Sequence, residues 1–445
     1  GGWDARISER ALREDLKMKL KFTNAKILPS PDEAILEGAV CVSDGKIVSV
    51  ASGSAGFAAD RVIDCGGNLL MSGFCNAHTH AAMSLFRGVA DDLPLDKWLF
   101  DRIFPMEDHL TPDDVYWGTM LQVAEFVKNG ITCMADMYFY PDTVYEAVKN
   151  SNLCLALCCG ANSYSTYDTV KFMSDMYSKY STVSDRVRYF PGLHAEYTCE
   201  ESLIAAVADL AAEIGAPTYI HLSETLKEVG ECTVRHGGLT PPQYLHKLGF
   251  FDNGGLAAHC TYADKDDIAL LKQSGVTPVV NGASNLKLAS GIAPVCAMLS
   301  AGMSPALGTD GSASNNATSM FREMYLYSCL QKESMKDASA VSAEEALKAA
   351  TVNGYAALGF GGGEIKEGKF ADMVLIDLSA PFMRPLSNLR KNIVYSADSS
   401  AVLMTVAGGK IVYENGEYRI GEPLEKIYAE CEKRVKRLLS EANFS

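Results

Sequence analysis

The sequence lacks long apolar runs, paired cysteine motifs and an excess of basic charge. No stretch approaches the roughly 20 consecutive apolar residues of a membrane span, so we expect no membrane partner. None of the 13 cysteines forms a CxxC pair, which argues against zinc-ribbon or thioredoxin-like chemistry and favours a reducing, cytoplasmic compartment. The formal net charge of −15 argues against nucleic acid as the main partner.

The chain does have ample apolar material for a globular protein. Hydrophobic residues make up 48% of 445 positions, enough for one barrel of about 250 residues with a smaller unit beside it. Residues 1–17 precede MKLKFTNAKIL, which reads like a natural start, so we interpret them as an added leader or an extension without function. Residues 420–445 have apolar positions at helical spacing, which predicts a C-terminal amphipathic helix.

The long middle of the chain, residues 76–364, alternates strand-like and helical segments. Helical patterns such as ESLIAAVADLAAEIG separate the strand-like runs, and this helix is expected to end at Gly215. Eight-fold alternation predicts an α/β fold, a (β/α)8 TIM-like barrel. Residues 18–75 and 365–419 show short strands with Asp-Gly and Asn-Gly turns, which predict one small β-sandwich-like domain built from both ends of the chain. The eight strand-like runs are FCNAHTH, ITCMADM, LCLALCC, VRYFPGLH, PTYIHL, LAAHC, VTPVVN and PALGTD.

Polar residues follow these predicted strands at the ends where a barrel of this kind carries its active site. His78 and His80 lie on one extended segment, where alternate residues share a face, so both imidazoles can reach one ion. Together with His221 and Asp310 they form a set of three imidazoles and one carboxylate. Such a set suits one divalent metal ion, preferably Zn²⁺ with Fe²⁺ as an alternative, and leaves a position for water. Five of the eight histidines close a predicted strand: His78, His80, His194, His221 and His259.

The combined motifs resemble the amidohydrolase superfamily. They are HTH (78–80), HLSET (221–225), AHC (258–260) and LGTDG (307–311). Within that superfamily, NAHTHAAMSLFRGVADDLPLDKWL (76–99) and HAEYTC (194–199) are most similar to the 5-methylthioadenosine/S-adenosylhomocysteine deaminases. The resemblance implies hydrolytic deamination of an adenosine-type nucleoside to the inosine analogue and ammonia by a metal-bound hydroxide. It also implies association into a homo-oligomer.

The resemblance further implies roles for particular residues. Glu224 would protonate the ring nitrogen, His259 would orient the attacking water, and Asp310 would accept its proton. Glu107 and His194 would hold the nucleoside, and Trp98 would form an apolar wall near its 5′ substituent. From the residues alone, Glu224 could instead be a solvated glutamate in the first turn of a helix, Glu107 an exposed carboxylate and Trp98 a core residue.

Two departures from the family pattern bear on the substrate. Residues 160–184 contain no arginine to hold the amino-acid carboxylate of S-adenosylhomocysteine. A buried carboxylate without a cation is costly, so 5′-methylthioadenosine, 5′-deoxyadenosine or adenosine is favoured. Glu196 is expected to add negative charge near the mouth.

Two kinds of alternative function stay open. One is a guanine, pterin or cytosine deaminase or a triazine chlorohydrolase on the same scaffold, and the other is a non-catalytic protein that kept only the fold.

Overall fold

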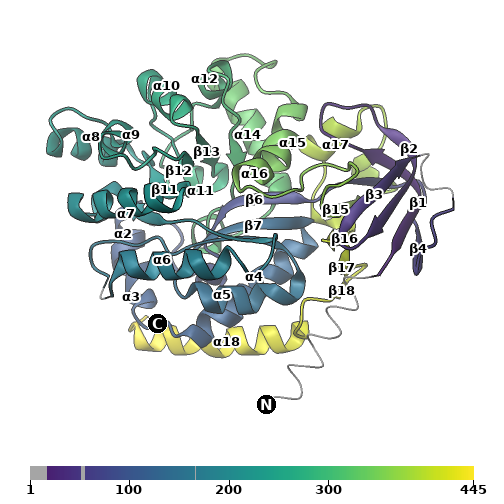
Figure 1. Ribbon diagram of the computed structural model, residues 1–445, viewed down its shortest axis with the longest axis horizontal. Helices are drawn as coiled ribbons and strands as arrows, with labels where there is room; N and C mark the ends of the chain where they lie inside the picture. The colour runs from purple at the N-terminus through teal and green to yellow at the C-terminus, as the bar shows by residue number, and fades with distance from the viewer. Residues whose placement is uncertain (1–17, 52–55, 166, 445) are drawn as a thin grey trace.

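The computed structural model describes residues 18–51, 56–165 and 167–444. It shows a barrel wrapped by helices, with a separate sheet along one side (Figure 1). The expected leader, residues 1–17, lies outside the described residues. Among the helices that the structure describes, none is long and apolar enough to cross a membrane.

The barrel strands pair in parallel throughout, in the order in which they occur along the chain. Proline at position 191 divides the fourth strand into two pieces, because it has no backbone N–H to donate. The ring closes where the backbone N–H groups of Thr309 and Asp310 donate to the carbonyl of His78, at 3.1 and 3.0 Å. The predicted (β/α)8 barrel is therefore confirmed. Its strands are β6 (Phe74–Thr79), β7 (Ile131–Met137), β8 (Cys154–Cys158), β9 with β10 (Val187–Tyr189 and Gly192–Ala195), β11 (Thr218–Leu222), β12 (Gly255–His259), β13 (Val276–Val280) and β14 (Ala306–Leu307).

Helices follow the strands and cover the outside of the barrel. The helix expected to close at Gly215 does so, since this residue takes the left-handed conformation (φ 64°) that glycine adopts without strain. Helix α4 begins with a capping box in which Thr111 and Asp114 bond each other's backbone N–H groups. The main helices are α4 (Pro112–Lys128), α5 (Pro141–Val148), α6 (Thr169–Tyr180), α7 (Glu201–Ile214), α8 (Leu226–Arg235), α9 (Pro241–Lys247), α10 (Lys265–Gln273), α11 (Gly282–Lys287), α12 (Val295–Ser300), α14 (Met320–Met335), α15 (Ala343–Ala350), α16 (Val352–Ala357) and α17 (Leu389–Tyr395).

Short helices precede α4 and cover part of the barrel mouth. They are α2 (Leu95–Trp98), the π-helix η3 (Leu99–Ile103) and α3 (Phe104–Glu107). Apolar side chains on these turns, among them Trp98 and Ile103, are buried. Burial of this kind of surface contributes about 25 cal/mol per Å², and it holds the turns over the strand ends.

Strands from the two ends of the chain form one nine-stranded sheet, as the sequence predicts. Purple strands from the beginning of the chain lie beside yellow-green strands from its end (Figure 1). The order is β18-β17-β16-β15-β5-β1-β2-β3, with β4 paired to β1. The exact domain boundaries stay a prediction. The strands are β1 (Leu20–Leu28), β2 (Leu36–Ser43), β3 (Lys46–Ala51), β4 (Arg61–Asp64), β5 (Leu69–Ser72), β15 (Met373–Ile376), β16 (Val402–Ala407), β17 (Lys410–Glu414) and β18 (Glu417–Tyr418).

A buried ion pair joins this sheet to the barrel. Arg186, just before β9, places a guanidinium nitrogen 2.8 Å from the carboxylate of Asp372, just before β15. Tyr355 also donates to Asp372, at 2.9 Å, and so does the backbone N–H of Gly408, at 2.6 Å. The carboxylate is thus fully hydrogen-bonded, which is the condition for a buried charge to be tolerated.

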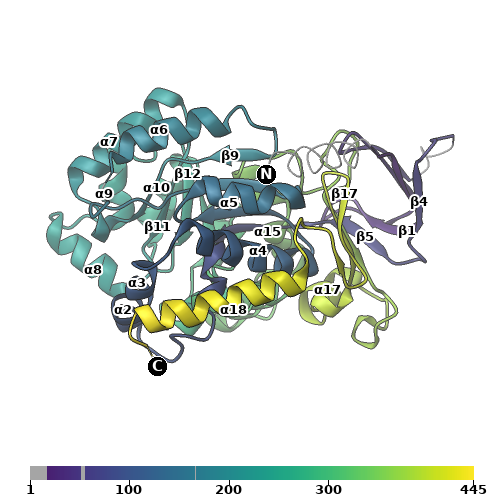
Figure 2. The same ribbon diagram turned by 90° about the horizontal axis from the view of Figure 1, so that it is seen from below.

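The predicted C-terminal helix is α18 (Leu424–Glu441), which lies along α4 (Figure 2). Its buried residues Ile427, Cys431 and Leu438 recur at helical spacing, and Arg434 forms an ion pair with Asp113 of α4. The helix therefore fixes α4 from outside, on the same side as the short helices at the mouth.

Candidate active site

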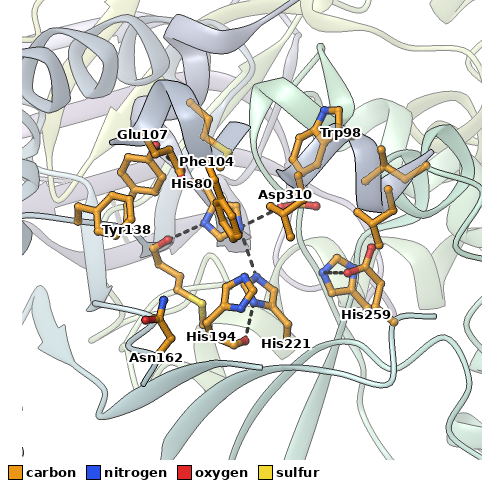
Figure 3. Close-up of a pocket in the computed structure, with 18 of the residues that line it drawn as sticks. His80, Trp98, Phe104, Glu107, Tyr138, Asn162, His194, His221, His259 and Asp310 are labelled. Carbon is orange, nitrogen blue, oxygen red and sulfur yellow. Dashed lines mark hydrogen bonds and ion pairs between the residues drawn. The ribbon is translucent and has the colours of Figure 1, made fainter. Parts of the chain in front are cut away.

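The predicted ligands come together at the carboxyl ends of the barrel strands. His78 lies near the end of β6 with His80 just beyond the strand, His221 lies in β11, and Asp310 follows β14. Figure 3 shows His80, His194, His221, His259 and Asp310 pointing into one cavity. One ring nitrogen from each of His78, His80 and His221 lies within 4.8 Å of the other two.

Hydrogen bonds at the far side of each ring determine its tautomer. The Nδ1 atoms of His80 and His221 donate to the carbonyl oxygens of Met137 and His194, at 2.5 and 2.7 Å. Nδ1 of His78 lies 2.6 Å from the Tyr219 hydroxyl, which gives its own proton to the carbonyl of Ala77. In its neutral form each of the three rings therefore carries its proton on Nδ1 and presents the lone pair of Nε2 to the cavity.

This arrangement fits a divalent cation. The Nε2 atom of His78 is buried without a hydrogen-bond partner among the described residues, and the Nε2 atoms of His80 and His221 face each other at 3.3 Å. Opposed lone pairs at that distance repel unless a positive charge lies between them. Burial lowers the pKa of His78 to about 4, so this ring is held in the neutral form that binds metals.

Asp310 supplies the negative charge beside these rings. Its Oδ1 lies 3.2 Å from Nε2 of His80, while Ser284 donates to Oδ2 at 2.6 Å. Although burial favours the protonated acid, the neighbouring imidazoles of His78 and His80 hold the pKa of Asp310 well below its usual value. Burial alone would lower the pKa of His80, but the carboxylate of Asp310 raises it to about 9, so that a proton on Nε2 takes the place of a cation when none is bound. The site thus stabilises a positive charge between the His80 ring and the Asp310 carboxylate, which is what binding of a cation requires.

Glu224 and His259 form a second pair at the edge of the same cavity. Nε2 of buried His259 lies 3.8 Å from Oε2 of Glu224, and its Nδ1 donates to the Asn285 side chain at 2.8 Å. Ser290 donates to Oε1 of Glu224 at 2.9 Å. Glu224 precedes Thr225, the residue that caps α8, so the alternative of a glutamate within the first helical turn is wrong.

The turn that carries Glu224 depends on a glutamate that the sequence analysis did not single out. The carboxylate of Glu228 accepts hydrogen bonds from the backbone N–H groups of Ser223 and Glu224, at 2.8 and 2.7 Å. Ser223 has a φ of 49°, an uncommon conformation for a residue other than glycine. The T-x-x-E capping box, Thr225 to Glu228, is a signal in the sequence that could have revealed this residue.

The predicted substrate-binding residues line the same pocket. Glu107 lies in helix α3 rather than in an exposed loop, and Tyr138 donates to it at 2.8 Å. Removal from water raises the pKa of Glu107 to about 7. His194 is the last residue but one of β10, and burial lowers its pKa to about 4. Trp98 is buried and lines the pocket with Leu95, Leu99 and Phe104, so it belongs both to the core and to the pocket wall.

Other pocket residues were not foreseen individually. Tyr138, Phe139, Asn162 and Tyr197 lie on loops after the strands, where no local pattern distinguishes them. No lysine or arginine is found among the described residues that line the pocket. The expectation for Glu196 is wrong: its carboxylate is buried between Arg235 and His236 and does not line the pocket. A buried carboxylate takes a cation and hydrogen-bond donors as partners, and these lie on α8 and at its end.

Comparisons with known proteins agree with this architecture. The family model described as "Amidohydrolase family" matches residues 69–412. The 5-methylthioadenosine/S-adenosylhomocysteine deaminase of Acetivibrio thermocellus is 38% identical over 432 residues, which cover 95% of this chain and all of the relative. The 5′-deoxyadenosine deaminase of Methanothermobacter thermautotrophicus is 39% identical over 395 residues, covering 87% of this chain and 92% of the relative.

Solved structures show the same likeness. A zinc-bound adenosine deaminase from Xanthomonas campestris superposes with a TM-score of 0.89 at 33% identity, over 95% of this chain and 98% of that one. The atrazine chlorohydrolase of Arthrobacter aurescens, at 21% identity and a TM-score of 0.85, covers 94% of this chain and all of its own, and shows the shared fold alone. The chain therefore belongs to the amidohydrolase family, among its 5-methylthioadenosine/S-adenosylhomocysteine deaminases, and is a hydrolase that acts on C–N bonds of cyclic amidines.

Proposed function

We propose that this protein replaces the 6-amino group of an adenosine-type nucleoside by oxygen, releasing ammonia. The observation that carries the proposal is the convergence of three Nε2 lone pairs and the Asp310 carboxylate beside Glu224, in a pocket with an apolar wall. Each chemical task in the reaction has a side chain of the right kind within this pocket.

One divalent ion, Zn²⁺ by preference, would be held by His78, His80, His221 and Asp310. Zn²⁺ suits this donor set of nitrogen and oxygen atoms, and Fe²⁺ is the alternative. When bound, the ion supplies Lewis acidity that lowers the pKa of water from 15.7 to about 7.

The chain's own residues move the protons. Water adds to the amino-bearing ring carbon, and Glu224 gives a proton to the adjacent ring nitrogen, so that negative charge does not build up there. Asp310 accepts the proton that water loses, and His259 orients the water through its Nε2, since its Nδ1 is engaged with Asn285. Asp310 returns its proton to the amino group, so that ammonia leaves, and the remaining hydroxyl proton passes to the Glu224 carboxylate as the ring carbonyl forms.

The rest of the pocket would hold the nucleoside. Glu107 would accept hydrogen bonds from the ribose hydroxyls, His194 would contact the nucleoside, and Trp98 would pack near the 5′ substituent. S-adenosylhomocysteine carries a carboxylate and an ammonium at that end, and removing an ion from water costs several kcal/mol unless a partner compensates. The described pocket wall offers the carboxylate no cation, so 5′-methylthioadenosine, 5′-deoxyadenosine and adenosine are the favoured substrates.

Steady-state kinetics of ammonia release with purified, metal-loaded enzyme test the proposal. We expect kcat/KM for 5′-methylthioadenosine to exceed that for S-adenosylhomocysteine by about 100-fold or more, the equivalent of about 2.7 kcal/mol. The uncharged 5′-butylthioadenosine, of similar length, separates charge from size and should stay close to 5′-methylthioadenosine. Equal rates for both natural thioethers would refute the selectivity.

The same assay distinguishes the alternatives. Turnover of guanine, pterins, cytosine or chlorinated triazines in preference to adenosine analogues would contradict the proposed substrate class. Absence of a bound transition metal in the purified protein would favour a non-catalytic role. Association into homo-oligomers and a cytoplasmic location stay predictions, which size-exclusion chromatography and localisation of the tagged protein can check.

A further inference from the structure

A second group of metal-ligating side chains lies beside the pocket wall. Glu196 begins η5 (Glu196–Thr198), Cys232 is in α8, and His236 follows the last residue of α8. Their ligand atoms lie within 4.8 Å of one another, the limit that the three histidines of the active site also meet. We propose that these three side chains form a second divalent-cation site, of the kind that suits Zn²⁺, which ties α8 to η5.

The local structure arranges the three donors around one point. Cys232 and His236 are four residues apart, which brings them to the same face at the end of α8. Nε2 of His236 lies 2.7 Å from Oε1 of Glu196, across the gap between α8 and η5. The ring of His236 stacks on Tyr244, with centroids 3.5 Å apart and planes at 12°, which fixes its orientation. Two ligands from the end of α8 and a third from the neighbouring turn are therefore already positioned to bind one ion.

Two of the three proposed ligands are shielded from water, and the third is partly exposed to solvent. Glu196 is 3% exposed and Cys232 is fully buried, whereas the side chain of His236 is 20% exposed and faces the entry. Arg235 binds the other oxygen of Glu196, Oε2, at 2.5 Å, and its own side chain is 38% exposed. The guanidinium therefore occupies the outer carboxylate oxygen, and Oε1 remains directed at His236 and available to a cation.

The donor set and the charge balance fit Zn²⁺. One thiolate, one imidazole and one carboxylate are all common zinc ligands, and water can complete a tetrahedral shell. On binding, the Cys232 thiol loses its proton to solvent, and neutral His236 binds through Nε2 with its proton on Nδ1. No electron transfer is involved. The bound cation then replaces the direct contact between Glu196 and His236.

The position of the cluster indicates a structural role. Neither Cys232 nor His236 lines the pocket, so the ion would not touch substrate. Glu196 directly precedes Tyr197, which does line it, and α8 also carries Glu228, which holds the turn of Glu224. A cation here would hold together two segments that shape the wall of the active site.

Cobalt titration of the full-length protein tests the proposal independently of deaminase activity. The four ligands proposed for the active site contain no sulfur, so a near-ultraviolet thiolate-to-Co²⁺ charge-transfer band cannot come from that site. We expect this band in wild-type protein, an additional equivalent of bound metal, and a higher thermal unfolding midpoint after Zn²⁺ is added to protein whose first site is filled.

Substitutions identify the ligands. Cys232→Ser and Glu196→Gln should abolish the band and the second equivalent while the first is retained; Cys431→Ser, which alters a buried thiol on α18, should change neither. His236→Gln removes the partly exposed ligand and leaves the two buried ligands, Glu196 and Cys232, in place. A single equivalent in both wild type and Cys232→Ser, or a band that survives Cys232→Ser, would overturn the proposal.

Discussion

Ser290 donates a hydrogen bond of 2.9 Å to Oε1 of Glu224, from a loop 66 residues further along the chain. The bond leaves the other oxygen, Oε2, directed toward His259. It therefore determines which oxygen of the proposed proton donor faces the pocket, and it acts on the carboxylate without contacting any proposed metal ligand.

Replacing Ser290 by alanine tests this positioning role. We expect Ser290→Ala to lower kcat about tenfold, the equivalent of about 1.4 kcal/mol, with a smaller change in KM, because orientation of the proton donor matters most in the transition state. Metal content should be unchanged. A pH–rate profile identical to that of the wild type, at full kcat, would contradict the role.

The hydroxyl of Tyr219 accepts the Nδ1 proton of His78 and thereby holds that ring in the metal-binding tautomer. We expect Tyr219→Phe to weaken metal binding by about 10- to 100-fold, measured by competition with a chelator. Tyr327→Phe is the matched control, since its buried hydroxyl has no hydrogen-bond partner in the part of the chain that the structure describes. Equal metal affinities of the two variants would disprove the effect.

Asp310 is the residue on which the proposed chemistry depends most. Asp310→Ala should lower ammonia release by a factor on the order of 10³ or more, because it removes both a metal ligand and the acceptor of the water's proton. Circular dichroism of the variant checks that the fold persists. Deamination at the parent's rate would refute the mechanism.

The pKa of Glu107, raised to about 7 by removal from water, predicts a pH-dependent KM. Below this pKa the carboxyl is protonated and accepts ribose hydroxyls poorly, so KM should rise as the pH falls from 8 to 6. The hydrogen bond from Tyr138 lowers the pKa of Glu107, so Tyr138→Phe should move the midpoint to higher pH. A KM that does not change between pH 6 and 8 would argue against ribose binding by Glu107.

The ion pair between Arg186 and Asp372 predicts a large loss of stability on truncation. Arg186→Met leaves a buried carboxylate without its cation and should lower the free energy of unfolding by about 3–5 kcal/mol, measured by urea denaturation. Lys171→Met, in the exposed pair with Asp175, should cost far less stability, because water screens that pair. A comparable loss of unfolding free energy in the two variants would show that the buried pair contributes no more to stability than an exposed pair.

The barrel and the convergence of the candidate metal ligands could be predicted from the sequence because the relevant signals are local. His78 and His80 share a face through simple strand alternation, and His221, His259 and Asp310 each end an apolar run. In a parallel barrel every strand ends at the same mouth, so the position of a residue along its own strand is enough to bring these side chains together.

Only the tertiary structure determined the contacts that orient and support those side chains. Tyr219 behind His78, Ser290 behind Glu224, and Arg186 against Asp372 join residues 66 to 186 positions apart. Glu196 shows the limit most clearly, since its sequence position beside a pocket residue indicated the mouth, yet its side chain turns toward α8. The direction of a side chain after a strand depends on which distant partners compensate its charge and hydrogen bonds, and no local pattern in the sequence records those partners.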